Sequence, residues 1–415
     1  MEGQGSVASL YATAPQDEYL LDPKYKWNKE RVQHSKFSID HSRYQFGNAP
    51  YFGTTQTFEI NPKSIPGDLL CNAYLRCKLP DIFANTYTDQ VGRAIIKTVS
   101  FYLSETEIET INDDWYIIRD QLFLSADEKN LMSNLINGNQ KNLTTGYSGG
   151  TIDLYIPLDF FFCRNFSLSR LDKKKPMFPL CAVWNQRIYI KIEFANLSQF
   201  STCNNGSFDF VDTPEIVFEH IMLEDQEREF YKNGYDMSIN KLYKEPVSDV
   251  DNIITNISLT AKFPVSLLVW FIKKKISSND PLTYNKRFDY SYITTNNLSL
   301  ADVDIFEYLN IYINNEDITD KLPGKKFYKY LQPLYAGLSS PTKDIYMYSF
   351  GLKPNQYNQG GSVDFSKVDS NTSFLSFKIK NQFVSDVSVN YTLNLYYYGY
   401  SLLKFSGGYC TKVYD

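Results

Sequence analysis

Two stretches of the sequence decide the fold: IIKTVSFYLSETEIET (residues 95–110) and IFEYLNIYINNEDITD (residues 305–320). They align without gaps at an offset of 210 residues, which is close to half of the 415-residue chain. Val99 falls on Leu309, and apolar residues recur around this pair in the same alternation. Each stretch reads as a strand, a polar tight turn and the start of a second strand. Because the turn is in phase as well as the apolar residues, the pair indicates duplication of one all-β domain.

The composition around the repeat favours the same fold class. The chain has 33 Tyr and 29 Phe but only 6 Met, and aromatic and β-branched side chains suit the pleated, half-buried surface of a sheet. From Tyr51 onwards, short alternating apolar runs are separated by turn signals, which is typical of a sandwich or barrel. The expected strands are 55–60, 69–79, 94–103, 151–158, 188–194 and 215–223, followed by 253–263, 267–272, 306–313, 345–352, 373–379 and 387–398.

One helix is well marked between these strands. Ser125 and Glu128 have the spacing of a capping box, in which each side chain bonds to the backbone N–H of the other residue. Leu131, Leu135 and Ile136 provide an apolar stripe behind it, and a glycine follows where the helix would end.

The domain organisation follows from the repeat and from the charge pattern. The polar first stretch reads as an arm, and the short charged segment 224–232 follows the first series of strands as a helical connector. The sequence therefore predicts an N-terminal arm (residues 1–25), a first β-sandwich (26–228) and a second β-sandwich (229–415), with short helices in the connecting loops.

The charge pattern excludes one class of function. A net charge of −5 argues against a surface that binds nucleic acid directly, because such a surface needs clustered Lys and Arg to neutralise phosphates. The basic runs at 173–175 and 273–275 border expected strands, and we interpret them as solvated strand ends or loops. Six cysteines without a C-x-x-C pair suit buried free thiols in a reducing compartment better than a disulfide framework.

No catalytic, cofactor or metal site is predicted. Residues 146–150 (GYSGG) match a nucleophile elbow around Ser148, but that elbow needs a strand before it and a helix after it. Here a polar loop precedes and an expected strand follows, so we interpret the segment as a loop. The three histidines, His34, His41 and His220, form no metal-binding pair.

Three acidic residues deserve a separate reading. Glu105, Glu107 and Glu109 alternate across the first repeated turn, and carboxylates at this spacing can share one face of a strand, as paired acids for glycoside cleavage would. Nothing in the surrounding sequence would keep one of them protonated, so we interpret them as a solvated face.

Several segments, in order along the chain, resemble the major capsid proteins of nucleocytoplasmic large DNA viruses. They are APQDEYLLDP (14–23), GDLLCNAYLRCKLP (67–80), Asp114-Trp115, YIPLDFFFCRN (155–165), FPLCAVWNQRIYIKIEF (178–194), KFPVSLLVWFI (262–272), YSFGLKP (348–354), DFSKVD (364–369) and LNLYYYGYSLLKFSGGYCTKVY (393–414). This sequence departs from the family pattern at Phe263, where His is usual, at Gly351, where Ala is usual, and at Lys367, where Arg is usual.

The resemblance implies a fold and a function. The fold is two tandem eight-stranded jelly-roll β-sandwiches, a double jelly roll. The function is that of a major capsid protein, which forms homotrimeric, pseudo-hexameric capsomers in the icosahedral shell of a double-stranded DNA virus. The resemblance implies no enzymatic activity and no cofactor. Its implied partners are further copies of itself, penton and minor capsid proteins, and an internal membrane reached through the N-terminal arm. Its implied location is the virion capsid, assembled in the host cytoplasm.

The resemblance also marks structural motif residues. They are Asp114, Trp115, Pro157, Phe160, Ser349, Phe350, Leu352, Pro354, Phe365, Ser366 and Asp369. A second-domain strand is expected at 348–354 and a turn at 364–369. The expected core positions in these two blocks are Phe350, Leu352, Phe365 and Val368. Ser366 and Asp369 are expected to bond to backbone groups of the turn.

Two other functions are compatible with this fold class. A double jelly roll also serves as a transient scaffold on immature virions of related viruses, and presence in the purified mature particle would separate capsid from scaffold. Jelly rolls also serve as lectins and glycoside hydrolases, which would require converging acids or an aromatic platform in a cleft. A screen for glycan binding would reveal that function.

Overall fold

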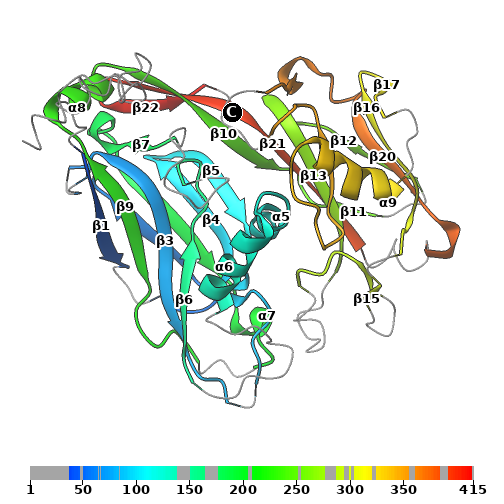
Figure 1. Ribbon diagram of the computed structural model, residues 1–415, viewed down its shortest axis with the longest axis horizontal. Helices are drawn as coiled ribbons and strands as arrows, with labels where there is room; N and C mark the ends of the chain where they lie inside the picture. The colour runs from blue at the N-terminus through cyan, green and yellow to red at the C-terminus, as the bar shows by residue number, and fades with distance from the viewer. Residues whose placement is uncertain are drawn as a thin grey trace, which may run out of the picture.

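The computed structural model describes residues 37–46, 50–63, 65, 67–83, 85–137, 150–163, 176–203, 208–250, 254–275, 287–293, 299–300, 303–319, 324–354, 360–383 and 391–413. Two β-sandwiches lie side by side (Figure 1). The strands described before residue 223 form the first sandwich, and those from residue 235 onwards form the second, except for a separate two-stranded sheet of Tyr292–Ile293 and Ser299–Leu300.

Each sandwich pairs two antiparallel sheets. In the first sandwich one sheet has the order β1 (Ser38–Gln45), β9 (Glu215–Met222), β3 (Leu69–Leu79), β6 (Ile152–Pro157), and the other β2 (Thr55–Ile60), β8 (Ile188–Phe194), β4 (Ile96–Leu103), β5 (Thr106–Asn112). In the second sandwich the orders are β10 (Tyr235–Lys244), β21 (Tyr391–Ser406), β13 (Pro264–Lys274), β18 (Tyr346–Ser349), and β12 (Ile254–Ser258), β20 (Phe374–Ile379), β16 (Phe306–Ile313), β17 (Glu316–Asp317).

The two sandwiches have the same topology. Reading both in chain order, β1 corresponds to β10, β2 to β12, β3 to β13, β4 to β16, β5 to β17, β6 to β18, β8 to β20 and β9 to β21. Even the short strand β7 (Phe178–Pro179) on β3 has a counterpart, β19 (Val363–Asp364) on β13. The connections between sheets follow the jelly-roll pattern, so the double jelly roll predicted from the sequence is confirmed.

The duplicated stretch forms equivalent hairpins. β4 and β5 are joined at Ser104, with φ 53°, and β16 and β17 at Asn314, with φ 51°. These residues are 210 positions apart, the offset of the sequence repeat. A left-handed residue is what a tight hairpin turn requires, so the in-phase turn in the sequence is an in-phase turn in space.

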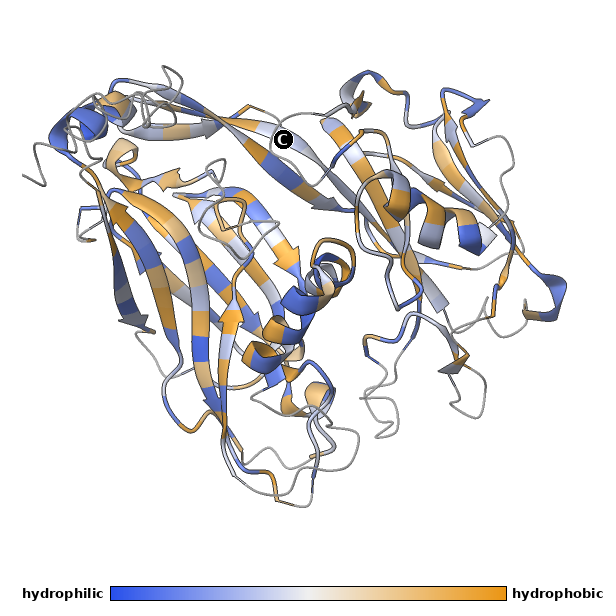
Figure 2. Ribbon diagram, in the orientation of Figure 1, coloured by the Kyte–Doolittle hydropathy of each residue, from blue (hydrophilic) through white to orange (hydrophobic). Residues whose placement is uncertain are grey.

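The hydrophobic core is continuous between the sandwiches. Alternating residues of the strands fill the first sandwich, as the orange and blue bands along β3 and β9 indicate (Figure 2). The same apolar cluster continues onto the outer face of the sheet β10–β21–β13–β18, where it includes Phe271, Tyr396 and Tyr398. Tyr397 points the opposite way, into the core of the second sandwich. This sheet is therefore covered on both faces, which explains three consecutive buried tyrosines in β21.

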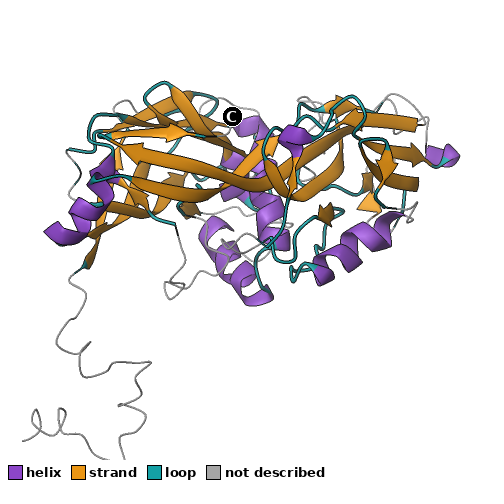
Figure 3. Ribbon diagram, turned by 90° about the horizontal axis from the view of Figure 1, so that it is seen from above, coloured by secondary structure: helices purple, strands orange, loops and turns teal. Residues whose placement is uncertain are grey.

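Helices lie between the two sandwiches and at their ends (Figure 3). The helices are α4 (Val91–Ile95), α5 (Asp113–Leu122), α6 (Ala126–Asn137), α7 (Leu197–Phe200), α8 (Asp225–Lys232), α9 (Gly324–Lys326) and α10 (Gln332–Tyr335). A π-helix, Phe327–Leu331, joins α9 to α10, and short 3₁₀ turns occupy Leu180–Ala182, Phe365–Lys367 and Asn381–Phe383. The remaining short strands are β11 (Ser248–Asp249), β14 (Tyr292–Ile293), β15 (Ser299–Leu300) and β22 (Tyr409–Lys412).

The structure corrects several local expectations. The capping box of α6 is present, since the backbone N–H of Ser125 donates to Glu128 at 2.9 Å and that of Glu128 to Ser125 at 3.3 Å. Its buried face, however, is made by Met132 and Ile136, while Leu131 is 57% exposed. The capping pair fixed where the helix begins, but which face is buried depends on the neighbouring sheet.

Other elements were not expected from the sequence at all. Among them are β1, β10 and α5. The expected strand at 345–352 is shorter in the structure, where β18 spans Tyr346–Ser349. No helix among the described residues is long and apolar enough to cross a membrane.

Candidate functional site

The motif pair Asp114-Trp115 lies at the joint between the sandwiches. Both residues are in the first turn of α5 and are buried. Trp115 stacks on Tyr398 of β21, with ring centres 5.5 Å apart and planes 25° from parallel. Asp114 accepts a hydrogen bond from the hydroxyl of Tyr290 at 2.8 Å and pairs with the ammonium of Lys273 at 2.8 Å. A first-sandwich helix is thus held by three residues of the second sandwich.

The neighbouring carboxylate makes a second link. Asp113 pairs with the guanidinium of Arg287, with Nη2 at 2.7 Å and Nε at 3.1 Å from the same oxygen. Both side chains are only 12% exposed. Burial works against ionisation of Asp113, but Arg287 and Lys273 outweigh it and hold the pKa of this carboxyl below its ordinary value.

Lys273 therefore does not fit the solvated strand end expected for the run 273–275. Its side chain is 17% exposed and faces Asp114, while Lys275 is 44% exposed and pairs with Asp249. Lys273 lies within β13, which ends at Lys274, and reaches α5 of the first sandwich, whereas Lys275 lies beyond the end of the strand. The other basic run, 173–175, lies outside the described residues.

Hydrogen bonds from the other end of α5 complete the joint. Ser339 donates through its N–H to the carbonyl of Leu122 and through its hydroxyl to that of Leu124, both at 2.8 Å. The hydroxyl of Thr342 donates to the side chain of Gln121 at 2.8 Å. The helix is fixed to the second sandwich at both ends, which makes the pair of sandwiches one rigid block.

Pro157 and Phe160 support the first sandwich side of the joint. Pro157 ends β6, and its carbonyl accepts a hydrogen bond from Arg93 at 3.0 Å. Arg93 is completely buried and pairs with Asp120 of α5 at 3.1 Å. Phe160 is also fully buried and packs edge-on against Phe101 with ring centres 5.5 Å apart. These residues anchor α5 to its own sandwich.

The motif block 348–354 is only partly strand. Ser349, the last residue of β18, donates through its N–H to Gln332 at 3.1 Å, and Phe350 packs against Phe365 at 5.8 Å. Leu352, which the sequence placed in the core, is instead 80% exposed. The chain turns out of the sheet after Ser349, and the N–H of Leu352 bonds to the carbonyl of Gly360.

Two further residues of this block define the turn. Pro354 is buried at its end. Gly351 stands where the family has Ala, and a Cβ there would lie 2.6 Å from the carbonyl oxygen of Gly361. The close approach of two backbone segments accounts for the glycine in this chain.

The block 364–369 is a turn, and its core positions agree with expectation. Phe365 is fully buried and Val368 is 9% exposed. Asp369 accepts from the N–H of Asn371 at 2.9 Å, as a turn residue should. Ser366 does not bond to the turn backbone. Its hydroxyl donates to Asp364 at 2.6 Å, and Asp364 also accepts from the N–H of Ser366, so the aspartate is the capping residue.

The glutamates of the first repeated turn, which could have served as paired acids, do not form a catalytic arrangement. A bulge in the β4–β5 pairing places Glu107 opposite Tyr102 and Glu109 opposite Phe101, so the acids do not share one solvated face as expected. Glu109 is 5% exposed and accepts from the N–H of Phe161, whereas Glu107 stays at the surface. A bulge adds a residue and breaks the alternation of two.

Metal and nucleophile chemistry also lack a described site. Ser148 and His34 lie outside the described residues, and His41 and His220 lie on neighbouring strands without a third ligand. In the part of the chain that the structure describes, no group of three His, Cys, Asp or Glu residues is placed to hold a metal ion, and none of the six cysteines is in a disulfide.

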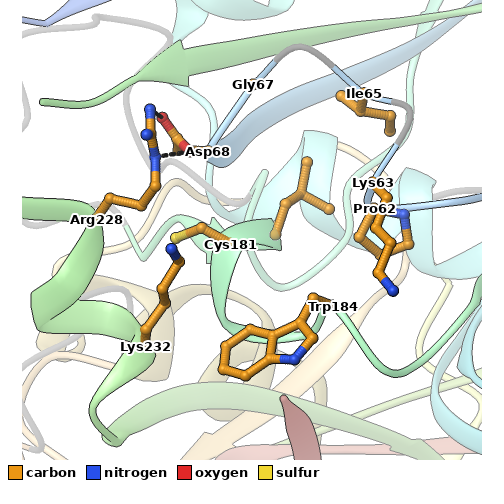
Figure 4. A pocket seen from close by; sticks show the side chains of 10 residues that line it. Pro62, Lys63, Ile65, Gly67, Asp68, Cys181, Trp184, Arg228 and Lys232 are labelled. Carbon is orange, nitrogen blue, oxygen red and sulfur yellow. Dashed lines mark hydrogen bonds and ion pairs between the residues drawn. The ribbon is translucent and has the colours of Figure 1, made fainter. Parts of the chain in front are cut away.

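A groove of about 450 Å³ opens beside α8 (Figure 4). Its lining includes Cys181, Trp184 and the lysines Lys63 and Lys232. Burial raises the pKa of Cys181 to about 11, so its thiol is protonated and a poor nucleophile at neutral pH. Arg228 at the rim is engaged by Asp68 at 2.7 Å. Among the described residues of its lining, the one carboxylate, Asp68, is held in this ion pair, and the groove gives no indication of catalysis.

The fold and the joint together define a class of protein. It is a rigid double jelly roll with two similar units, which is the architecture of a subunit that builds a shell. Family models extend this conclusion to the sequence. The model of the major capsid protein N-terminus matches residues 26–217, and that of the large eukaryotic DNA virus major capsid protein matches residues 228–410. The chain belongs to the major capsid protein family of large eukaryotic DNA viruses.

Individual relatives match most of the chain. The major capsid protein of Pyramimonas orientalis virus is 24% identical over 399 residues, which cover 94% of this chain and 96% of the relative. That of Paramecium bursaria Chlorella virus 1 is 24% identical, with coverage of 90% and 87%. Among solved structures, the PBCV-1 virus capsid gives a TM-score of 0.74 at 19% identity, covering 92% of this chain and 98% of the other. The Faustovirus major capsid protein gives 0.69 at 10% identity, covering 90% and 91%.

The protein is therefore a structural component of a viral capsid and not an enzyme, because the family is structural. Its similarity to capsid proteins indicates that it is located in the virion capsid.

Proposed function

We propose that three copies of this chain associate into a homotrimer that serves as a pseudo-hexameric capsomer of an icosahedral shell. One observation carries the proposal: the chain contains two jelly rolls of identical strand order, joined rigidly through a buried helix. Two similar units per chain and threefold symmetry give six similar units around one axis, which can tile a hexagonal lattice.

The solution mass tests this proposal. Light scattering or native mass spectrometry of the purified full chain should give three times the chain mass at all concentrations where the capsomer is stable. A monomer whose mass does not change with concentration would contradict it.

The division of the chain into an arm (1–25), a first jelly roll (26–228) and a second jelly roll (229–415) is part of the proposal. It is supported by α8, which lies between the last strand of the first sandwich and the first strand of the second. Limited proteolysis should cut before residue 26 first, and an early cut inside either sandwich would argue against these bounds.

The remaining partners are proposed from the family. They are penton and minor capsid proteins, with the N-terminal arm directed to minor proteins or an internal membrane on the inner side of the shell, and assembly in the host cytoplasm. Cross-linking of purified particles followed by mass spectrometry tests them, because arm peptides should be joined to other virion proteins. The alternative role, a scaffold of immature virions, requires that the protein be missing from mature particles.

A further inference from the structure

The groove beside α8 has a preformed apolar surface. Its lining includes Leu180 and Trp184, which follow β7, and Ile65, which lies on the connection from β2 to β3. The indole of Trp184 lies against Gly408, where an added Cβ would come within 2.7 Å of the ring, and the N–H of Asn185 donates to the carbonyl of Gly408 at 3.1 Å. The tryptophan is therefore fixed in place, and a fixed surface loses little entropy when a ligand binds.

Positive charge surrounds this apolar surface. Lys63 and Lys232 reach the groove from opposite sides (Figure 4). Lys63 is exposed, and the side chain of Lys232 is 35% exposed and pairs with the exposed Glu229 at 3.1 Å. Arg228 and Asp68 neutralise each other at the rim. The groove is therefore suited to a ligand that carries negative charge and apolar side chains together.

The N-terminal arm of this chain contains a segment with that chemistry. Residues 17–22, with the sequence DEYLLD, combine three acidic side chains with one tyrosine and two leucines. Before this segment the arm has one acidic residue, Glu2, and residues 23–36 carry four Lys and one Arg. The acidic and apolar side chains that match the groove are thus gathered in one short stretch, which we call the DEYLLD segment.

The chain enters the first sandwich next to the groove. Ser38, the first residue of β1, pairs with Met222 at the end of β9. The following residue, Leu223, donates its N–H to Asp68 of the groove at 2.8 Å, and Figure 1 shows the start of β1 close to α8. Residues 23–36 can extend for about 45 Å. This length is ample for a site beside their own point of attachment.

Attachment favours the DEYLLD segment over any separate molecule. A short flexible tether holds a ligand near its site at an effective concentration in the millimolar range. An affinity too weak for a free peptide is therefore enough for occupancy, and the entropy of closing a loop grows only slowly with its length. The volume of about 450 Å³ is that of a site for a few side chains and not for a folded partner.

We infer that the DEYLLD segment binds in the groove beside α8 of its own chain. Its apolar side chains contact Leu180 and Trp184, and its carboxylates face Lys63 and Lys232. Residues 1–16 stay free for the partners proposed above, and the docked segment sets where they leave the subunit. The inference does not depend on the proposed homotrimer.

Photo-cross-linking from the arm tests the inference. The full chain is produced with the photoreactive residue p-benzoylphenylalanine in place of Tyr19, and in a control in place of Tyr11, which lies outside the DEYLLD segment. Irradiation of the purified Tyr19 variant should give a product that migrates as a monomer on a denaturing gel. Mass spectrometry should map the cross-link to residues 180–184 or 225–232. The control should give no cross-link to these peptides.

The outcomes of this experiment are distinct. Covalent dimers joined through the groove peptides would show that the arm of another copy fills the groove, and they would overturn the inference. So would cross-links from position 19 to another segment, no cross-link at all, or the same groove peptides from position 11. None of these results bears on the mass of the trimer, so the proposed function would stand or fall separately.

Alkylation of Cys181 gives an independent readout. Cys181 lines the groove and is partly exposed, whereas the other five cysteines are buried, so iodoacetamide should modify it first. Leu20→Asn should raise its modification rate at least about fivefold, since the variant removes an apolar side chain from the groove. Leu10→Asn should leave the rate unchanged. Equal rates in the wild type and the Leu20 variant would contradict the inference.

Discussion

At the scale of residues, the joint depends on charged side chains that have little exposure to solvent. Asp114 is 6% exposed and Lys273 17% exposed, and each lies on a different sandwich. A buried pair contributes little compared with apolar packing, but the loss of one partner leaves an uncompensated charge. Single substitutions at this joint should therefore be costly, although the same pair at the surface would be worth almost nothing.

The first prediction compares a buried pair with an exposed one. Asp114→Ala should lower the free energy of unfolding by about 3 to 5 kcal/mol, because Lys273 loses its partner inside the joint. Asp249→Ala removes the partner of Lys275 at the surface and should change it by less than about 0.5 kcal/mol. Urea unfolding of both variants provides the measurement, and similar losses in the two would refute the distinction.

The second prediction concerns acid. Arg287 and Lys273 hold the pKa of Asp113 below its ordinary value in the folded protein, whereas the unfolded chain has the ordinary value of about 3.9. A depressed pKa contributes stability above the unfolded value, and this stability is lost as the pH falls through the folded value. The stability advantage of the wild type over Asp113→Asn should thus be constant from pH 7 to about 5 and shrink below about pH 4. An advantage that is unchanged at pH 3 would contradict this assignment.

At the scale of elements, the register of two strands depends on one glycine. A Cβ on Gly399 would lie 2.0 Å from the carbonyl oxygen of Pro264 and 2.8 Å from the Cα of Val265. These are backbone atoms at the β13–β21 bulge, so neither can move without disturbing the sheet.

The third prediction follows from this contact. Gly399→Ala should lower the free energy of unfolding by about 3 kcal/mol or more, since overpacking of a sheet interior forces the backbone to shift. Gly337→Ala serves as the control: that glycine has φ +67° but open space around it, so only the cost of a left-handed residue, about 1 to 2 kcal/mol, is expected. Thermal unfolding of both variants measures the difference, and a smaller effect at Gly399 than at Gly337 would be inconsistent with the bulge geometry.

At the scale of the whole molecule, the two sandwiches share one apolar cluster. Domains with a large apolar interface unfold together, whereas domains with a small interface unfold separately. Trp115 of the first sandwich stacks on Tyr398 of the second within this cluster. A rigid joint is what a shell subunit needs, because the angle between its two units sets the geometry of the capsomer.

The fourth prediction is a single unfolding transition that Trp115 maintains. Differential scanning calorimetry of the unassembled chain should show one peak for the wild type. Trp115→Ala should split it into two, besides the loss of about 3 to 5 kcal/mol that accompanies removal of a large buried side chain.

Phe377→Ala is the control for this prediction, since Phe377 is fully buried inside the second sandwich only. It should lower the transition temperature and leave a single peak. Two peaks in the wild type would show that the sandwiches are not coupled.

The sequence by itself determined the repeat, the sheet type and the bounds of several strands. The expected strands 55–60, 69–79, 188–194 and 306–313 agree with β2, β3, β8 and β16 to the residue. Alternation of apolar side chains is a local property of a strand with one buried face, so it can be read from the chain alone. The segments that resemble the capsid protein family likewise indicate the class of protein from the sequence alone.

Only the tertiary structure determined what packs against the second face of each sheet. It buried Glu109 and partly buried Lys273, which the sequence placed in solvent, and it exposed Leu352, which the sequence placed in the core. It also brought Asp114 and Trp115 to the joint, where their motif gains a role that their spacing does not reveal. The physical reason is that the burial of these side chains depends on packing between segments far apart in the chain, and the local pattern contains no information about those segments.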